Sequence, residues 1–145
     1  MQLDIKTPFE MAGGFRVDDT PVHKAFREAL ANCLINADYY GHQGLVIIKK
    51  RGLITLSNPG DFRIELADAK SGGISDPRNG ALMKMFNLID VGERAGSGIP
   101  SIYYVWKEQG WDEPTITQSY SPDRVRLSLP LTKSVDKKVL IKRRR

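Results

Sequence analysis

Three side chains that can bind a cation or move a proton recur at intervals of four residues: Glu28, Asn32 and Asn36. On a helix, this spacing places them in one stripe along the axis. A carboxylate and two carboxamides in such a stripe can hold a hydrated Mg²⁺, with Glu28 acting on a water molecule as general base. The alternative is a partly buried helix flank whose polar groups make ordinary hydrogen bonds.

Two glycine-containing segments could complete a site for a phosphate-bearing ligand. The loop from Gly96 to Gly98 leads into a predicted helix, where backbone N–H groups and the helix N-terminus favour phosphate oxygens. The segment from Asn58 to Gly60 ends a predicted strand abruptly. The Walker phosphate loop and the dinucleotide fingerprint are both absent from the sequence. Taken alone, each segment is also typical of a simple connector.

The polar stripe belongs to a segment that predicts a helix from Thr20 to Tyr40. Thr20 can cap the first turn, and Pro21 suits the first helical position. Ala31 is assigned to the outer side of this helix, and Gly41 is expected to end it. The apolar face recurs at three- and four-residue spacing and consists of Val22, Phe26, Ala29, Leu30, Cys33, Leu34 and Ala37.

The rest of the chain predicts a sheet and two further helices. Residues 45–48 form a continuous apolar run, typical of a strand buried on both faces. Residues 53–58 alternate in polarity and form a hairpin with that run across Arg51-Gly52. The remaining predictions are a helical turn within residues 62–70, helices at about 79–88 and from 99 to 110, and strands at 115–120 and 124–130. This pattern predicts a two-layer α+β sandwich whose sheet is mainly antiparallel.

Length and composition indicate one domain of an ordinary globular protein. The chain has 145 residues, of which 41% are hydrophobic and 27% are charged. It contains no apolar run near the ~18 residues of a membrane helix, and its N-terminus does not resemble a signal peptide. The single cysteine, Cys33, lies on the apolar helix face, which predicts a buried, inert thiol and a reducing, cytoplasmic setting.

The net charge of +5 is concentrated at the C-terminus. From Leu131 onward, seven cations and one anion sum to +6, which leaves −1 for residues 1–130. We therefore expect a single domain at residues 1–131, with an N-terminal arm at 1–19. Residues 132–145 are expected to be a basic tail or linker in a fragment of a longer protein. Such a tail can contact the phosphate backbone of DNA.

The order and spacing of these segments resemble the RecG-like C-terminal ATPase-type domain. The similarity runs from Phe9 to Leu131, and its motifs lie at residues 27–39, 57–60, 76–79 and 93–99. This family resembles a branch of the GHKL (gyrase, histidine-kinase and MutL) ATPase superfamily. The resemblance implies the Bergerat fold, a mixed, mainly antiparallel sheet with helices on one face and ATP between helices and lid. Similar domains follow AlbA/Schlafen-type domains in proteins labelled transcriptional regulators.

The resemblance also implies roles for individual residues. Glu28 takes the place of the catalytic or water-orienting acid, and Asn32 that of the Mg²⁺ ligand. Where the superfamily has an aspartate that reads the adenine amino group, this chain has Asn58. The implied nucleotide-binding residues are Asn32, Asn36, Asn58, Gly60, Gly96, Ser97 and Gly98.

Three functions follow as hypotheses. The first is an ATP-binding regulatory module of a transcriptional regulator, with weak Mg²⁺-dependent hydrolysis. The second is a non-hydrolysing Bergerat domain that serves as a protein-interaction or dimerisation scaffold, in a homo-oligomer for example. The third is a DNA-contacting domain, either through the basic tail or indirectly through another domain. We do not expect a helicase, because the chain lacks a Walker loop and is too short for tandem motor domains.

Overall fold

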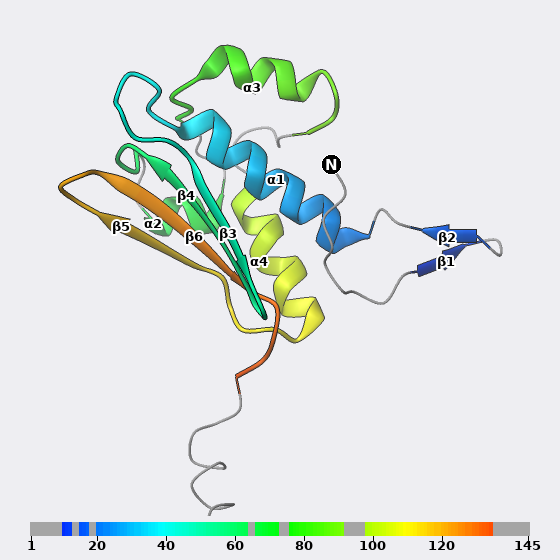
Figure 1. The fold of residues 1–145 in the computed structure, drawn as a ribbon. Coiled ribbons are helices and arrows are strands. Elements are labelled where there is room, and N and C mark those ends of the chain that lie inside the picture. Colours follow the sequence, from blue (N-terminus) through cyan, green and yellow to red (C-terminus); the bar gives the residue numbers. More distant parts are fainter. Residues whose placement is uncertain are drawn as a thin grey trace, which may run out of the picture.

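The computed structural model of the chain describes residues 10–12, 15–17, 20–63, 66–72, 76–91 and 98–134. Figure 1 shows the arrangement of the elements in these ranges. In chain order they are β1 (Glu10–Ala12), β2 (Phe15–Val17), α1 (Pro21–Asn36), β3 (Val46–Lys50), β4 (Leu53–Pro59), α2 (Leu66–Ser71), α3 (Gly80–Asn87), α4 (Gly98–Gln109), β5 (Thr115–Ser119) and β6 (Arg124–Pro130).

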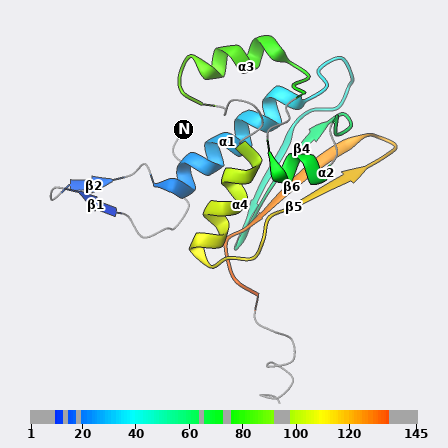
Figure 2. The ribbon, with the colours of Figure 1, turned by 180° about the vertical axis from the view of Figure 1, so that it is seen from behind.

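The main sheet has four strands in the order β3-β4-β6-β5, and every neighbouring pair is antiparallel. Helices α1, α2 and α4 lie on one face of this sheet, as the two opposite views show (Figures 1 and 2). The predicted two-layer α+β sandwich is therefore confirmed. The small antiparallel hairpin of β1 and β2 stands apart, beyond the N-terminal end of α1.

The core lies between α1, α4 and the inner side of the sheet. Trp106 of α4 is fully buried, and its indole N–H donates to the carbonyl of Pro130 at 2.6 Å. This bond ties α4 to the end of β6 and satisfies the polar atom that a buried indole carries. Among the residues that the structure describes, the other large, fully buried apolar side chains are Phe26, Ile54, Leu56, Ile102, Leu129, Val22 and Pro114.

Helix α1 begins where the sequence predicts and ends earlier. The hydroxyl of Thr20 accepts a hydrogen bond from the backbone N–H of His23, as expected of an N-cap. The prediction that the helix continues to Gly41 is wrong, since Ala37 adopts an extended backbone with φ −68° and ψ 141°. The next residue, Asp38, donates its N–H to the carbonyl of Pro59 at 2.9 Å. A contact with the end of β4 therefore replaces the last expected turn.

The outer side of α1 also differs from the prediction. Ala31 is only 1% exposed, although its position in the sequence pattern assigned it to solvent. Helix α3 packs against α1 and lies on the side of α1 that faces away from the sheet (Figures 1 and 2). The pattern of one helix does not indicate which later segment will cover its polar side.

The prediction that β3 is buried on both faces is wrong. Val46, Ile47 and Ile48 are 45%, 46% and 45% exposed. The reason is position, because β3 is an edge strand that pairs only with β4 among the described strands. A continuous apolar run does not distinguish an edge strand from a central one.

The remaining predicted elements are confirmed with small shifts at their ends. β3 and β4 form the predicted hairpin, in which Lys50 pairs with Leu53 around the two-residue turn. Val125 and Leu129 of β6 point into the core, as the alternation predicts. Helix α4 ends at Gln109, and the following Gly110 has φ +72°. No helix in the described ranges is long and apolar enough to span a membrane.

Candidate functional site

A cavity of about 140 Å³ lies between α1, the inner side of the sheet and the start of α4. All three side chains of the predicted polar stripe, Glu28, Asn32 and Asn36, line it. Asn58, from the end of β4, and Gly98, the first residue of α4, line it too. The tertiary structure therefore brings together segments that are separated by up to 70 positions in the sequence.

The floor of the cavity is apolar. It is formed by one side of α1 and by inward-facing strand residues, which include Leu56, Val125 and Leu127. The N-terminus of α4, a helix of 12 residues, forms part of the cavity wall through Gly98 and Ile99. The partial positive charge of a helix N-terminus favours an anionic group at this wall. The cavity thus combines an apolar floor with an anion-favouring wall and a polar flank.

The amides of the polar stripe hydrogen-bond to each other. Asn36 donates its side-chain N–H to the side-chain oxygen of Asn32 and also to the Asn32 backbone carbonyl, the latter at 2.9 Å. The Asn32 side-chain oxygen is therefore already an acceptor. An amide oxygen has two lone pairs, so a divalent cation can bind the second one while Asn36 keeps its hydrogen bond.

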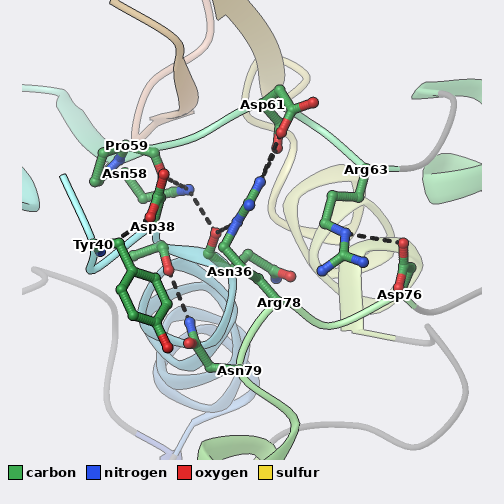
Figure 3. A network of polar contacts seen from close by, with 11 residues as sticks. Asn36, Asp38, Tyr40, Asn58, Pro59, Asp61, Arg63, Asp76, Arg78 and Asn79 are labelled. Atoms are coloured by element: carbon green, nitrogen blue, oxygen red, sulfur yellow. Dashed lines mark hydrogen bonds and ion pairs between the residues drawn. The ribbon is translucent and has the colours of Figure 1, made fainter.

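The rim of the cavity contains an arginine that joins three segments. Arg78 forms an ion pair with Asp61, with 2.7 Å between Nη2 and Oδ1, and it donates from Nε to the Asn36 carbonyl at 3.3 Å. Figure 3 shows its guanidinium extended between these two residues. The same guanidinium packs over Gly60, which has φ +110° and where an added Cβ would lie 3.1 Å from Nη2. Gly60 itself is not one of the residues that line the cavity.

The neighbouring Asn79 holds the end of α1. Its side-chain amide donates to the carbonyls of Ile35 and Ala37 at 2.7 and 2.8 Å, and its backbone N–H donates to Ile35 at 3.0 Å. The last carbonyls of a helix lack partners within the helix. Together with Arg78, Asn79 supplies these partners from the segment that precedes α3. This clamp fixes the C-terminal end of α1, and with it the position of Asn36.

A second ion pair lies at the cavity. Arg63 and Asp76 both line it, and 3.0 Å separates Nε of the arginine from Oδ2 of the aspartate (Figure 3). Both side chains are partly open to solvent, at 39% and 46% exposure, so the pair contributes little to stability. Its chemical importance is that an anionic ligand in the cavity can compete with Asp76 for Arg63.

Two ionisable groups at the site have shifted pKa values. The hydrogen bond from Arg78 is the main cause of the lowered pKa of Asp61, which keeps this carboxylate ionised. Burial raises the pKa of Cys33 to about 11, and the charge of Arg124 opposes part of that rise. The Cys33 thiol in the cavity wall is therefore neutral at physiological pH, in agreement with the predicted inert cysteine.

Six of the eight predicted site residues can be located in the described structure. Glu28, Asn32, Asn36, Asn58 and Gly98 line the cavity, and Gly60 lies behind its rim. Gly96 and Ser97 fall outside the described residues. The roles assigned to all eight remain predictions.

Four charged cavity or rim residues were not predicted as site residues: Asp61, Arg63, Asp76 and Arg78. A sequence signal existed for two of them, because the motif at residues 76–79 was recognised without a role. It could not be interpreted, since the partners of Arg78 and Asn79 are mostly backbone carbonyls more than 40 positions away in α1. Because every residue has a backbone carbonyl, the residue types in the sequence do not indicate which carbonyls will accept these hydrogen bonds.

The donor set fits a magnesium ion that is held jointly with a ligand. The described residues contain no cluster of three or more His, Cys, Asp or Glu side chains suited to a metal. Mg²⁺ commonly takes only one or two protein oxygens and completes its shell with water and substrate phosphates. The Asn32 oxygen, one turn from Glu28, can supply such a contact with its second lone pair.

Comparison with protein families places the chain in a known group. The family model described as "Putative ATP-dependent DNA helicase recG C-terminal" matches residues 46–129, more than half of the chain. This range contains Asn58 and residues 96–98 and does not include α1. A search of the curated proteins found no match.

Among solved structures, the chain is similar to the crystal structure of the DIP2311 protein from Corynebacterium diphtheriae, with a TM-score of 0.65. Sequence identity is 21%, and the similarity covers 78% of this chain. It covers 24% of that protein, so the chain spans about a quarter of its length. At this identity the similarity shows a shared fold.

Proposed function

The chain belongs to the RecG C-terminal ATPase-like family, and from this premise we propose that its cavity binds an adenine nucleotide with Mg²⁺. The observation that supports the proposal is the meeting of three distant segments at one cavity. These are the polar stripe of α1, the end of β4 at Asn58, and the N-terminus of α4 at Gly98. An apolar floor suits a flat base, and the helix N-terminus suits phosphates.

Asn58 supports the choice of adenine. Its side-chain N–H group donates within the fold, to the carbonyls of Asn36 at 3.5 Å and Pro59 at 3.4 Å. The remaining polar atom of this buried side chain is the carbonyl oxygen, an acceptor only. An acceptor is the complement of the exocyclic amino group of adenine, so the amide can serve where a carboxylate is expected.

In the proposed complex, Asn32 holds the Mg²⁺ and Gly98 lies beside the phosphates. Glu28 orients the attacking water, which would give slow hydrolysis if the complex turns over. The proposed module would report nucleotide state within a cytoplasmic transcriptional regulator, whose other domains would contact DNA. The chain itself would be a regulatory module of that protein and not a helicase motor.

The proposal is tested by isothermal titration of the chain with ATP and Mg²⁺. Gly98→Val places a side chain at the cavity wall and should abolish binding, together with ligand-induced thermal stabilisation. Gly80→Val is the matched control, because Gly80 also begins a helix and an added Cβ there meets no atom within 4 Å. Binding retained in Gly98→Val would contradict the proposed site.

Two further variants separate binding from hydrolysis. Asn32→Ala should weaken binding of Mg²⁺-ATP much more than binding of metal-free ATP, because it removes the proposed cation ligand. Glu28→Gln should bind ATP as the parent does and lose about 10²–10⁴-fold in any hydrolysis. Titration with and without Mg²⁺ and a phosphate-release assay measure the two effects. Equal losses of metal-free and Mg²⁺-ATP in Asn32→Ala would contradict its role.

A second candidate function is a non-hydrolysing scaffold. It is favoured by one observation, the hydrogen bond that Asn36 donates to the side-chain oxygen of Asn32, the proposed cation ligand. In that case the polar stripe is a self-satisfied helix flank. If millimolar Mg²⁺-ATP gives no binding heat in the titration and no rise in melting temperature, the scaffold function would replace the nucleotide proposal.

A further inference from the structure

Two ion pairs join the segment that follows β4 to the segment that precedes α3. In the first pair, Asp61 of the earlier segment contacts Arg78 of the later one. In the second pair, Arg63 of the earlier segment contacts Asp76 of the later one, so the signs of the charges are reversed. Figure 3 shows both pairs in one view. Charge therefore holds the two segments together at two points beside the cavity.

The two pairs differ in how firmly their arginines are held. Arg78 also donates to the carbonyls of Asn36 and Asp61, at 3.3 and 3.2 Å, and its side chain is 24% exposed. Arg63 contacts Asp76 at 3.0 Å through Nε and is 39% exposed. No other described residue accepts a hydrogen bond from Arg63. The pair of Arg63 is therefore the one that a ligand can open at small cost.

Arg63 is also the only cation among the described residues that line the cavity. The acidic residues that line it are Glu28, Asp61 and Asp76, so an anionic ligand is repelled by most of the charged groups that it meets. A guanidinium binds phosphate through parallel N–H bonds from its planar fork, and the terminal nitrogens of Arg63 have donors free for this purpose. A phosphate chain carries several negative charges, whereas Asp76 offers one.

We propose that Arg63 binds a phosphate group of the nucleotide and that Asp76 is its internal competitor, which leaves the arginine when the ligand binds. This inference rests on the proposed function, because it takes the ligand of the cavity to be a nucleotide. The exchange makes binding depend on the phosphates of the ligand. The pair of Arg78 with Asp61 keeps the two segments joined while Asp76 is released.

The test compares ATP with adenosine, each titrated into the full chain with Mg²⁺ in a calorimeter. Arg63→Gln should weaken ATP binding roughly tenfold or more, because a charge-assisted hydrogen bond is lost. Adenosine binding should not change, since adenosine has no phosphate. Asp76→Asn should bind ATP about two- to fivefold more tightly, because the arginine no longer has to leave a carboxylate. Unchanged ATP affinity in Arg63→Gln would overturn the proposal.

A double variant separates the pairing of Asp76 from its general repulsion of an anion. If Asp76 acts by occupying Arg63, Asp76→Asn should give no gain in ATP affinity when Arg63 is already glutamine. Asp90→Asn is the matched control, since it removes the same charge from an exposed residue whose φ of 56° suits asparagine. It should leave both affinities unchanged. An equal gain from Asp76→Asn in both backgrounds would overturn the role of Asp76 as a competitor.

A spectroscopic readout follows the exchange directly. In the ¹⁵N-labelled chain, the Nε–Hε resonance of Arg63 is identified by its loss in Arg63→Gln. It should shift when ATP is added and stay in place when adenosine is added. An ion pair that only joins two loops gives no such difference. Binding of ATP without a shift of this resonance would contradict the proposed contact.

Inorganic tripolyphosphate, which has no base, distinguishes this inference from the proposed function. If ATP binds and neither Arg63→Gln nor Asp76→Asn changes its affinity, the inference is overturned and the nucleotide site stands. If tripolyphosphate binds through Arg63 as tightly as ATP, the nucleotide proposal is overturned and the exchange with Asp76 stands. If no ligand binds at millimolar concentration, both are overturned.

Discussion

Gly60 occupies a position where a side chain is excluded for two reasons. Its φ of +110° is unfavourable for any residue with a Cβ, and that Cβ would meet the Arg78 guanidinium at 3.1 Å. Gly110 offers a matched comparison, because its φ of +72° is also positive but no atom lies within 4 Å of an added Cβ. Substitutions at the two glycines therefore distinguish the cost of backbone strain from the cost of displacing the Arg78 side chain.

We expect Gly110→Ala to lower the free energy of unfolding by about 1–2 kcal/mol, the cost of a left-handed alanine. Gly60→Ala should cost more, because the ion pair and hydrogen bonds of Arg78 must also shift. Urea denaturation of both variants measures the difference. Equal losses would show that the Arg78 contact contributes nothing at Gly60.

Cys33 links burial to a pH dependence of stability. Its pKa is about 11 in the folded chain, against 9.0 for a free thiol, mainly because burial disfavours the thiolate. Between these values the unfolded chain has lost the proton while the folded chain keeps it. The thiol therefore contributes stability that is fully present below pH 9 and is lost as the pH rises toward 11.

We expect the parent chain to lose roughly 1 kcal/mol more unfolding free energy than Cys33→Ala between pH 8 and pH 10. Chemical denaturation at both pH values gives this difference directly. As a second readout, an aromatic disulfide reagent should label the native thiol only slowly at pH 8. Rapid labelling, or parallel pH curves for the two proteins, would contradict the buried, neutral thiol.

At the scale of elements, the segment before α3 clamps the end of α1. Asn79 does not cap its own helix with its side chain, and it donates to two carbonyls of α1 instead. The clamp joins α3 to the helix that carries the polar stripe. Because α3 itself has no buried residue, we infer that this polar contact is a main attachment of α3 to the domain.

Asn79→Ala should lower the free energy of unfolding by about 1–3 kcal/mol, since it leaves helix-end carbonyls without partners. Asn87→Ala is the control at the other end of α3, where the buried side-chain oxygen of Asn87 has no hydrogen-bond partner. This control should be nearly neutral, because it removes an unsatisfied group. Denaturation of both variants tests the clamp, and a larger loss in Asn87→Ala would contradict it.

At the scale of the whole molecule, the net charge of the chain comes from its C-terminal residues. Residues 135–145 contain six cations and one anion, and this +5 equals the net charge of the entire chain. Residues up to Ser134 are therefore neutral overall. The described fold includes Ser134, whose backbone N–H donates to the Asp112 carboxylate at 3.0 Å. A cut after this residue removes the tail charge without touching that contact.

We expect a chain truncated after Ser134 to keep the melting temperature and any nucleotide binding of the parent. Salt-sensitive binding to duplex DNA should be lost, because each phosphate contact contributes about −0.9 to the slope of log K against log salt. Fluorescence anisotropy at several salt concentrations measures that slope for both proteins. DNA binding retained in the truncated chain would place the contact in the folded domain.

The sequence alone determined most of the elements and several of the residues that line the cavity. Capping at Thr20, the apolar spacing of α1, the hairpin turn before Leu53 and the inward alternation of β6 are local signals, and local geometry decides them. The four-residue spacing of Glu28, Asn32 and Asn36 placed all three on one side of α1, where the cavity lies. The motif order indicated the family, which the family match supports independently.

Only the tertiary structure decided the features that depend on distant neighbours. The early end of α1 depends on contacts with Pro59 and Asn79, and the exposure of β3 depends on its place at the edge of the sheet. The ion pair of Arg78 with Asp61 joins residues 17 positions apart in the sequence. The order of strands in a sheet and the choice of backbone carbonyls as hydrogen-bond acceptors produce no periodic pattern of residue types in a sequence. The sequence therefore predicts which side of an element is apolar, while the assembled fold decides what covers it.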